Sequence, residues 1–209
     1  MLKNFDKNQN YYKFYKRKNI PIVFIHGVGL DHEMWFPQIR SFKNNSILVY
    51  DLLGHGKTPL NKKSVNFEDF SKQLNNLLNN LNIKKINLVG FSFGSLVALN
   101  FAKKYQKKVN KLILISTVFK RDNLEKYNVR ERYKKAKKNI PISNLALKRW
   151  LSPKFINNNP KIKKYILTTL NKKNKDYLNF LKSYKLFSYF KDSAKEIKKI
   201  KVPSLVLTG

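Results

Sequence analysis

Residues 85–105 read KINLVGFSFGSLVALNFAKKY and combine a short apolar run, a serine between two glycines and a longer apolar segment. Residues 86–89 have the length and composition of a buried strand, whereas the apolar residues after Gly94 recur at the spacing of a mostly buried helix. A Gly-x-Ser-x-Gly turn between a strand and a helix predicts that the hydroxyl of Ser92 stands exposed above the carboxyl end of the strand. The helix would direct its first free N–H groups toward the same place.

Further apolar runs of strand length lie on both sides of this stretch, at residues 10–15, 20–25, 47–50, 111–115 and 202–207. Helical segments separate them. In one of these segments, Phe67, Phe70 and the leucines that follow recur at helical spacing after a capping Asn66. Strands that alternate with helices predict the α/β fold class, with a mostly parallel sheet and helices on both of its faces.

The region from residue 118 to residue 198 has a different character, because it shows helical periodicity without a convincing buried strand. Prolines divide it into several helical segments. We therefore expect residues 1–117 to form the first part of a core and residues 118–198 a helical cap, inserted after the sixth strand. Residues 199–209 would begin the return of the chain to the core sheet.

The composition bounds the functional classes. The chain has 209 residues, no cysteine and a formal net charge of +32. Such a charge indicates either a binder of nucleic acid or anionic membranes or a genome-wide bias toward AT-rich codons, which favour Lys, Asn, Ile, Tyr and Phe. The lysines are spread along the whole chain, so the second interpretation is preferred, and neither a specific nucleic-acid partner nor a membrane partner is expected.

The sequence lacks the signals of membrane-spanning, secreted and cofactor-binding proteins. No apolar run approaches the length of a membrane span, and the first residues lack a signal-peptide core, so a cytoplasmic location is the default expectation. There is no metal-ligand cluster, phosphate-binding loop or dinucleotide fingerprint, so no cofactor is expected. The oligomeric state is left open.

Several motifs, taken in chain order, resemble those of the α/β-hydrolase family over nearly the whole length. They are Ile25-His26-Gly27 after one strand, Asp51 with Gly54-His55-Gly56 after the next, Gly90-Phe91-Ser92-Phe93-Gly94, the helical cap, and the VPSLVLTG run at residues 202–209. The resemblance implies a serine hydrolase fold, from which the last strand and its covering helices would be missing here.

Within this family the cap is similar to that of 3-oxoadipate enol-lactonases. Residues 149–155 read RWLSPKF, close to the Arg-Trp-Phe-Thr/Ser-Pro-x-Phe segment of those enzymes, and Asp176-Tyr177 stands where they carry Gly-Tyr. Asp51-Leu52-Leu53 departs from the Asp-Thr-Arg that usually precedes their Gly-His-Gly turn, which weakens the lactone assignment.

The resemblance implies roles for five residues. Ser92 would be the nucleophile, and a serine rather than an aspartate at this turn favours acyl-enzyme chemistry. The backbone N–H groups of Phe93 and Val28 would stabilise the oxyanion. Trp150 and Arg149 would line the substrate pocket, with Arg149 meeting a substrate carboxylate; equally, Trp150 would be cap core and Arg149 a solvated helix residue.

The base and the acid of the family's triad are not evident in the sequence. The triad order is serine, acid, histidine, yet all three histidines precede Ser92. We expect His26 and His55 to hydrogen-bond loop backbone, and His32 to be a surface residue where a short helix begins. Asp122 is a substitute acid or, more simply, the start of a cap helix.

These absences lead to an interpretation of the chain as a fragment of a longer gene product, with the acid and histidine beyond Gly209. By itself it would be inactive or very weak, and residues 202–207 would form an exposed apolar edge strand. The expected function of the full-length form is hydrolysis of a small carboxylic ester or lactone through a serine acyl-enzyme. The alternative is a non-catalytic binding domain of the same fold.

Overall fold

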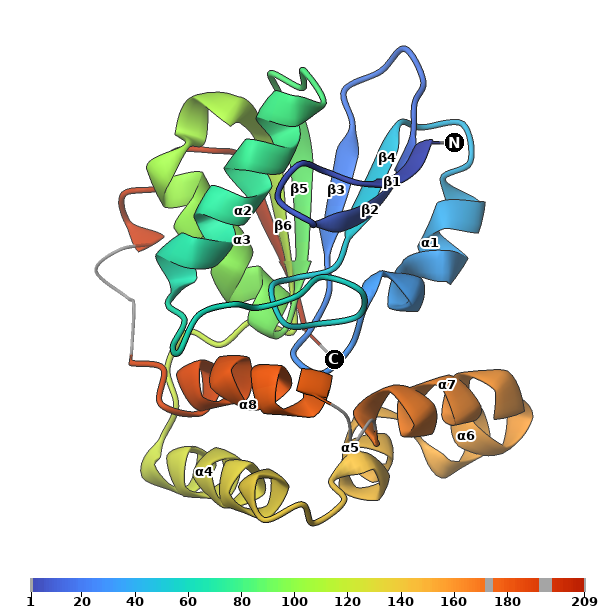
Figure 1. Ribbon diagram of the computed structural model, residues 1–209, viewed down its shortest axis with the longest axis vertical. Helices are drawn as coiled ribbons and strands as arrows, with labels where there is room; N and C mark the ends of the chain where they lie inside the picture. Colours follow the sequence, from blue (N-terminus) through green and yellow to red (C-terminus); the bar gives the residue numbers. More distant parts are fainter. Residues whose placement is uncertain (1, 172–174, 192–196, 209) are drawn as a thin grey trace.

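A seven-stranded sheet in the order β1-β2-β4-β3-β5-β6-β7 forms the centre of the computed structural model, which describes residues 2–171, 175–191 and 197–208 (Figure 1). The five strands from β4 to β7 in this order run parallel, whereas β1 and β2 pair antiparallel at one edge. The strands are β1 (Leu2–Phe5), β2 (Tyr11–Tyr15), β3 (Ile22–Ile25), β4 (Ile47–Tyr50), β5 (Ile86–Phe91), β6 (Val109–Ile115) and β7 (Ser204–Leu207). The α/β class predicted from the sequence is confirmed, and β1 is an additional strand that the pattern did not indicate.

Helices cover both faces of the sheet. α2 (Phe67–Asn80) and α3 (Phe93–Lys104) lie side by side on one face, while η1 (His32–Trp35) and α1 (Phe36–Ser41) lie on the other (Figure 1). A capping box begins α2, because Asn66 and Asp69 each bond the other's backbone N–H. The apolar side of α2 then packs with α3 against the strands, in a core that includes the fully buried Phe70, Leu74 and Phe101.

Five helices form a cap at the end of the sheet to which the parallel strands run (Figure 1). Leu170 and Phe180 of the cap approach the loop after β3 so closely that a Cβ on Gly29 would lie 2.7 Å from Leu170. The cap thus rests directly on a loop that borders the candidate site. Its helices are α4 (Asn123–Lys137), α5 (Ser143–Trp150), α6 (Pro153–Asn158), α7 (Pro160–Leu170) and α8 (Lys175–Ser188).

The sequence from Asp31 to Phe42 predicts a short helix with Trp35, Phe36, Ile39 and Phe42 packed inward, and the structure differs from this prediction at Phe36 and Phe42. Trp35 is buried against Phe24, with ring centroids 4.8 Å apart. Phe36 and Phe42 are 59% and 44% exposed. The helical spacing was misleading here, because α1 has only six residues and a single indole fills the space against the sheet.

β7 is the outer parallel strand of the sheet, and all four of its residues are exposed. Its apolar side chains Leu205, Val206 and Leu207 are 53%, 52% and 44% exposed. Among the described residues only β6 pairs with it. The expected exposed edge strand is therefore present in the structure.

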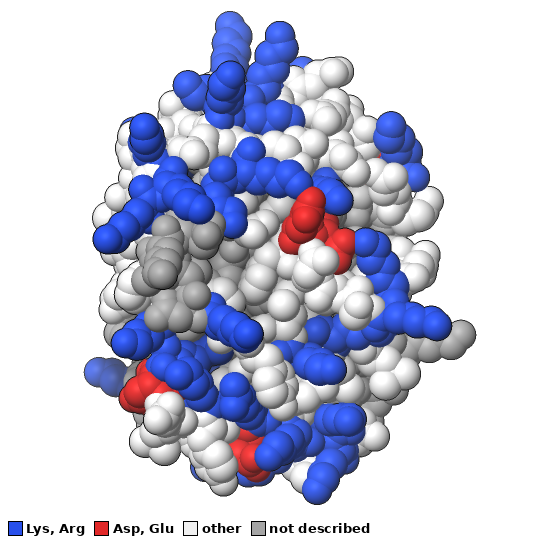
Figure 2. Space-filling view, turned by 90° about the vertical axis from the view of Figure 1, so that its left-hand side faces the viewer, with Lys and Arg blue, Asp and Glu red and all other residues white. Residues whose placement is uncertain are grey.

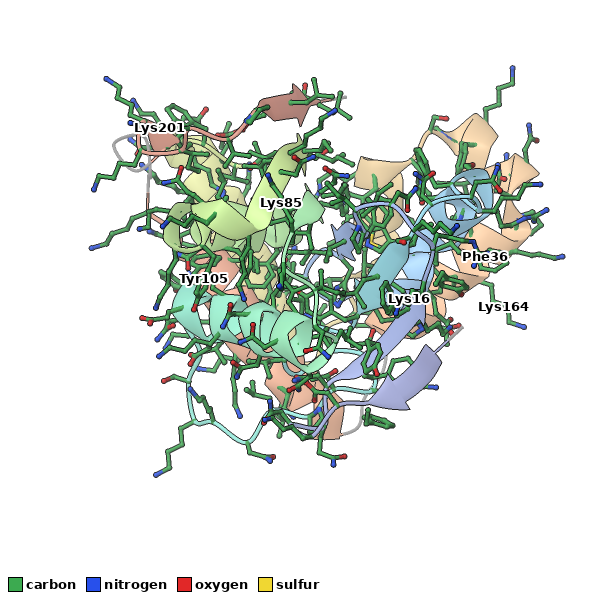
Figure 3. The ribbon with its side chains drawn as sticks, turned by 90° about the horizontal axis from the view of Figure 1, so that it is seen from above. Lys16, Phe36, Lys85, Tyr105, Lys164 and Lys201 are labelled. Atoms are coloured by element: carbon green, nitrogen blue, oxygen red, sulfur yellow. The ribbon has the colours of Figure 1, made fainter. Side chains whose placement is uncertain are left out.

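Positive charge covers the surface broadly. On the face that carries α2 and α3, lysine and arginine side chains are scattered instead of forming one stripe (Figure 2). Seen from the end opposite the cap, Lys201 and Lys164 lie on opposite sides of the molecule, with Lys85 between them (Figure 3). This distribution agrees with a bias of composition better than with one nucleic-acid footprint. No helix within the described residues is long and apolar enough to cross a membrane.

Candidate active site

The turn between β5 and α3 holds Ser92 in a strained backbone conformation. Its φ and ψ are 52° and −115°, which a non-glycine residue rarely adopts. The N–H of Ser92 donates to the carbonyl of Ile115 at the end of β6, at 2.9 Å. The turn is thereby fixed from the neighbouring strand, and the side chain of Ser92 lies on a cavity under the cap.

Two glycines make this turn possible by close approach. A Cβ on Gly94 would lie 2.4 Å from the carbonyl oxygen of His26, and one on Gly90 would lie 2.4 Å from the carbonyl oxygen of Gly94. Both contacts are with backbone atoms, which cannot move aside as a flexible side chain can. The spacing of the Gly-x-Ser-x-Gly motif is therefore explained by packing of α3 against β5 and the end of β3.

The hydroxyls of Ser95 and Thr117 form a hydrogen-bonded pair that stabilises the turn at Ser92. Ser95 Oγ donates to the carbonyl oxygen of Ser92 at 2.5 Å and lies 2.7 Å from Thr117 Oγ1. Because a hydroxyl carries one proton, the hydroxyl of Thr117 donates to Ser95 in this arrangement. The bonds connect the nucleophile turn to the segment that follows β6.

The expected oxyanion donors lie on either side of Ser92. Phe93 is the first residue of α3, where N–H groups have no intrahelical acceptor, and its side chain is fully buried. Val28 lies in the loop after β3 and borders the same cavity as Ser92. A Cβ on the adjacent Gly27 would lie 3.6 Å from the Cβ of Ser92, so this loop passes close to the nucleophile.

A cavity of about 400 Å³ separates the sheet from the cap. The floor comes from the loop after β3 and from Ser92, and the walls come from the segment after β6 and from α4, α5, α7 and α8. Arg149 and Trp150, at the end of α5, both border it, as the pocket interpretation predicts. Arg149 remains exposed to solvent at the cavity wall.

Two further arginines border the cavity that the sequence reasoning did not single out. Arg121, just after β6, is 8% exposed and donates from Nη1 to the carbonyl of Phe187 at 2.9 Å. Arg132, on α4, lies beside the buried Tyr184 of α8, where burial raises the pKa of the tyrosine and the charge of Arg132 opposes that rise. Their signal in the sequence is weak, because a basic residue stands out little in a chain with 44 lysines and arginines.

His26 and His55 are engaged by loop backbone, as expected. His26 Nδ1 donates to the carbonyl of Gly27 at 2.8 Å, and its Nε2 accepts from the N–H of Leu52 at 3.0 Å. An imidazole with this pair of bonds is neutral, and burial lowers its pKa, partly offset by Asp51. His55 Nδ1 donates to the carbonyl of Leu53 at 3.1 Å, and burial together with His26 lowers its pKa to about 3.

His32 is not the surface residue expected at the start of a helix. It is 2% exposed, and its backbone N–H and Nδ1 both donate to Oδ1 of Asp51, at 2.8 Å and 2.7 Å. Oδ2 of Asp51 accepts the N–H of Lys57 at 2.8 Å. The pair forms because Asp51, at the end of β4, needs donors once it is buried.

Asp122 has the helix-start role and does not border the cavity. It is the N-cap of α4, where it accepts the N–H of Glu125 at 2.7 Å while Glu125 Oε2 accepts the N–H of Asp122 at 3.1 Å. This capping box accounts for the carboxylate without a catalytic role. The side chains of Asp176 and Tyr177 lie outside the part of the structure that is described.

Comparison with known proteins supports the fold described above. A family model described as "alpha/beta hydrolase fold" matches residues 20–148. The (E)-2-((N-methylformamido)methylene)succinate hydrolase of Acinetobacter baylyi is 26% identical over 97% of this chain and 76% of its own length. The 3-oxoadipate enol-lactonase 1 of the same organism is 25% identical over 92% of this chain and 71% of its own length. The crystal structure of the enol-lactonase from Burkholderia xenovorans LB400 superposes with a TM-score of 0.84, at 23% identity, over 97% of this chain and 79% of that one.

Proposed function

The chain belongs to the α/β-hydrolase fold family, and from that premise we propose that it acts on a small carboxylic ester or lactone through a serine acyl-enzyme. In the proposed reaction, Oγ of Ser92 attacks the carbonyl carbon, and the acyl–oxygen bond breaks as the departing alcohol oxygen takes up the proton that the hydroxyl of Ser92 loses. Water then releases the acid. The two relatives compared above are a hydrolase and a lactonase by name, which supports this class of substrate.

The observation that carries the proposal is the backbone of Ser92. A positive φ at a non-glycine residue costs about 1–3 kcal/mol, and here it presents a hydroxyl to a cavity at the start of a helix. The N–H groups of Phe93 and Val28 are the proposed oxyanion donors, since both belong to elements that adjoin Ser92. Strain of this kind, next to a helix N-terminus, supports a nucleophile better than it supports an ordinary turn.

We further propose that these 209 residues by themselves catalyse weakly. All three histidines precede Ser92 in the sequence, and each is bonded to a loop backbone group or to Asp51. Without a base, the serine hydroxyl is a poor nucleophile at neutral pH. The oxyanion donors alone would leave roughly a thousandfold advantage over water.

Covalent labelling of Ser92 tests the proposal. A fluorophosphonate with a short alkyl chain should phosphonylate Ser92 slowly, with loss of fluoride, because the oxyanion donors are retained while the three histidines are engaged elsewhere. Peptide mapping by mass spectrometry after long incubation would locate the adduct. Ser92→Ala should remove the label, whereas Ser204→Ala, at another exposed serine, should retain it. Labelling that is equal at several serines, or absent from Ser92, would contradict a nucleophilic role.

A non-catalytic binding domain of the same fold is the second possibility. The observation that favours it is that His26, His32 and His55 are all committed to structural hydrogen bonds. On this view the cavity would bind a small molecule without converting it. An unlabelled Ser92 in a protein that still binds a cavity ligand would be the expected result.

A further inference from the structure

Positive charge is concentrated on the cap side of the cavity. The cavity is bordered by four basic side chains, Lys120, Arg121, Arg132 and Arg149, and among the described residues by one acidic side chain, Glu125. The carboxylate of Glu125 already accepts the backbone N–H of Asp122 in the capping box of α4. The positive side chains at this side of the cavity thus outnumber the one carboxylate that could neutralise them.

The guanidinium of Arg121 is anchored but not saturated. Nη1 donates to the carbonyl of Phe187, and the guanidinium lies 4.5 Å from the centroid of the Phe187 ring. Nη2 is buried and has no hydrogen-bond acceptor among the described residues. A buried donor without a partner is costly, so a ligand atom at this place would be stabilised.

Arg132 presents a second donor of the same kind. Its side chain lies beside Tyr184, while its Nε is buried and lacks an acceptor in the described part of the chain. Burial, and secondarily the charge of Arg132, lowers the pKa of Arg121. Atoms packed around the guanidinium of Arg149, and secondarily the charge of Arg132, lower the pKa of Arg149 as well, although much of that side chain remains open to solvent. The guanidinium of Arg132 therefore repels those of Arg121 and Arg149 across one small space.

We propose that Arg121, Arg132 and Arg149 form a subsite for a dianionic group, so that the ligand of the cavity carries two negative charges at the end remote from the carbonyl that Ser92 would attack. Two charges match the site better than one, because a single charge would leave two of the guanidiniums uncompensated. Guanidinium forks bind carboxylates and phosphates by paired N–H donors. This inference rests on the proposed function in one respect, the position of the reacting carbonyl at Ser92.

Binding of unreactive anions tests the subsite without catalysis. The probes are succinate, inorganic phosphate and, as a monoanion of similar size, propionate, each titrated calorimetrically into the 209-residue protein at constant ionic strength near 0.15 M. Constant salt matters because a chain of charge +32 attracts every anion weakly. We expect succinate or phosphate to bind at least about tenfold more tightly than propionate.

Matched variants separate a built subsite from diffuse attraction. Arg132→Gln should weaken binding of the dianion at least about tenfold. Lys137→Gln removes the same charge from the exposed last turn of α4, outside the cavity, and should leave affinity nearly unchanged. If Arg132→Gln does not fold, Arg149→Gln serves, because that side chain is exposed. Equal effects at Lys137 and at a cavity arginine, or equal affinities for succinate and propionate, would overturn the proposal.

Failure of this proposal is distinguishable from failure of the proposed function. Ser92→Ala should bind succinate as the parent chain does, since the arginines lie on the cap and not on the turn between β5 and α3. If Ser92 is labelled but the dianion does not bind, the proposed nucleophile stands and the proposed subsite is wrong. If the dianion binds but Ser92 is not labelled, the proposed subsite stands and the protein is better described as a binding domain.

Discussion

The imidazole of His32 and the carboxylate of Asp51 form a buried pair, with Nδ1 and Oδ1 2.7 Å apart. The same carboxylate accepts the backbone N–H groups of His32 and Lys57. It therefore connects the loop after β3, which carries Val28, to the loop after β4. Burial alone would raise the pKa of Asp51, but the hydrogen bond and charge of His32 outweigh that effect and lower it.

Asp51→Asn should destabilise the protein strongly. The amide keeps the size of the side chain but replaces one acceptor oxygen with a donor, so that a backbone N–H or His32 loses its partner in a buried place. Breaking a buried pair on one side typically costs about 3–5 kcal/mol. Urea unfolding should show this loss, whereas Asp69→Asn, in the exposed capping box of α2, should cost about 1 kcal/mol. A loss at Asp51 no larger than that at Asp69 would contradict the structural role.

Stability should fall as the pH is lowered from about 6.5 toward 3, through His55. Burial, together with His26, lowers the pKa of His55 from 6.5 to about 3. Between these values the unfolded chain binds a proton that the folded chain does not, so protons favour unfolding. The loss should reach up to about 3 kcal/mol at pH 4.

The pH effect is measured by urea midpoints at pH 7 and pH 5. Acid also affects carboxylates and His26, so the informative quantity is the difference between the parent and His55→Gln. The amide of glutamine can still donate to the carbonyl of Leu53, which is the bond His55 makes. The variant should lose less stability than the parent on going to pH 5, and an identical loss would assign the effect elsewhere.

Gly94→Ala should disrupt the nucleophile turn. The added Cβ would lie 2.4 Å from the carbonyl oxygen of His26 and 2.5 Å from that of Ile25, both backbone atoms of the adjoining strand and loop. Overpacking of this severity costs about 1–3 kcal/mol or more. Gly27→Ala is the matched change, because the nearest atoms to its Cβ belong to side chains, those of Phe91 at 3.0 Å and Ser92 at 3.6 Å. Thermal melts should show a clearly larger drop for Gly94→Ala, and similar drops would mean that the turn can relax.

The sequence predicted the parts of the fold whose signals are local. The strand, serine turn and helix at residues 85–105 appear as β5, Ser92 and α3, because periodicity and two glycines specify them within one short stretch. The cap at Asn66 was likewise visible in the sequence, and the structure adds its reciprocal bond with Asp69. The cap could be predicted as helical, and Arg149 and Trp150 as bordering a pocket, from one continuous segment.

What the sequence did not show depends on contacts between distant segments. His32 and Asp51 are 19 residues apart, and nothing near His32 in the sequence indicates a buried carboxylate partner. Arg121 and Arg132 meet Phe187 and Tyr184 only when α8 packs on α4. Phe36 was misplaced for a related reason, since helical periodicity does not say how far a helix extends over the sheet.

Substituting Leu205 with lysine should reduce aggregation of the protein. β7 forms the outer edge of the sheet, and its apolar residues expose about half of their surface. An apolar edge strand offers unpaired N–H and C=O groups to another chain, and a charge placed on it opposes such pairing. Light scattering on incubation at 37 °C should therefore rise more slowly for Leu205→Lys. Leu124→Lys is the control, because Leu124 is 67% exposed but lies on α4, away from any strand. Equal protection by both changes would show that net charge matters and the edge does not.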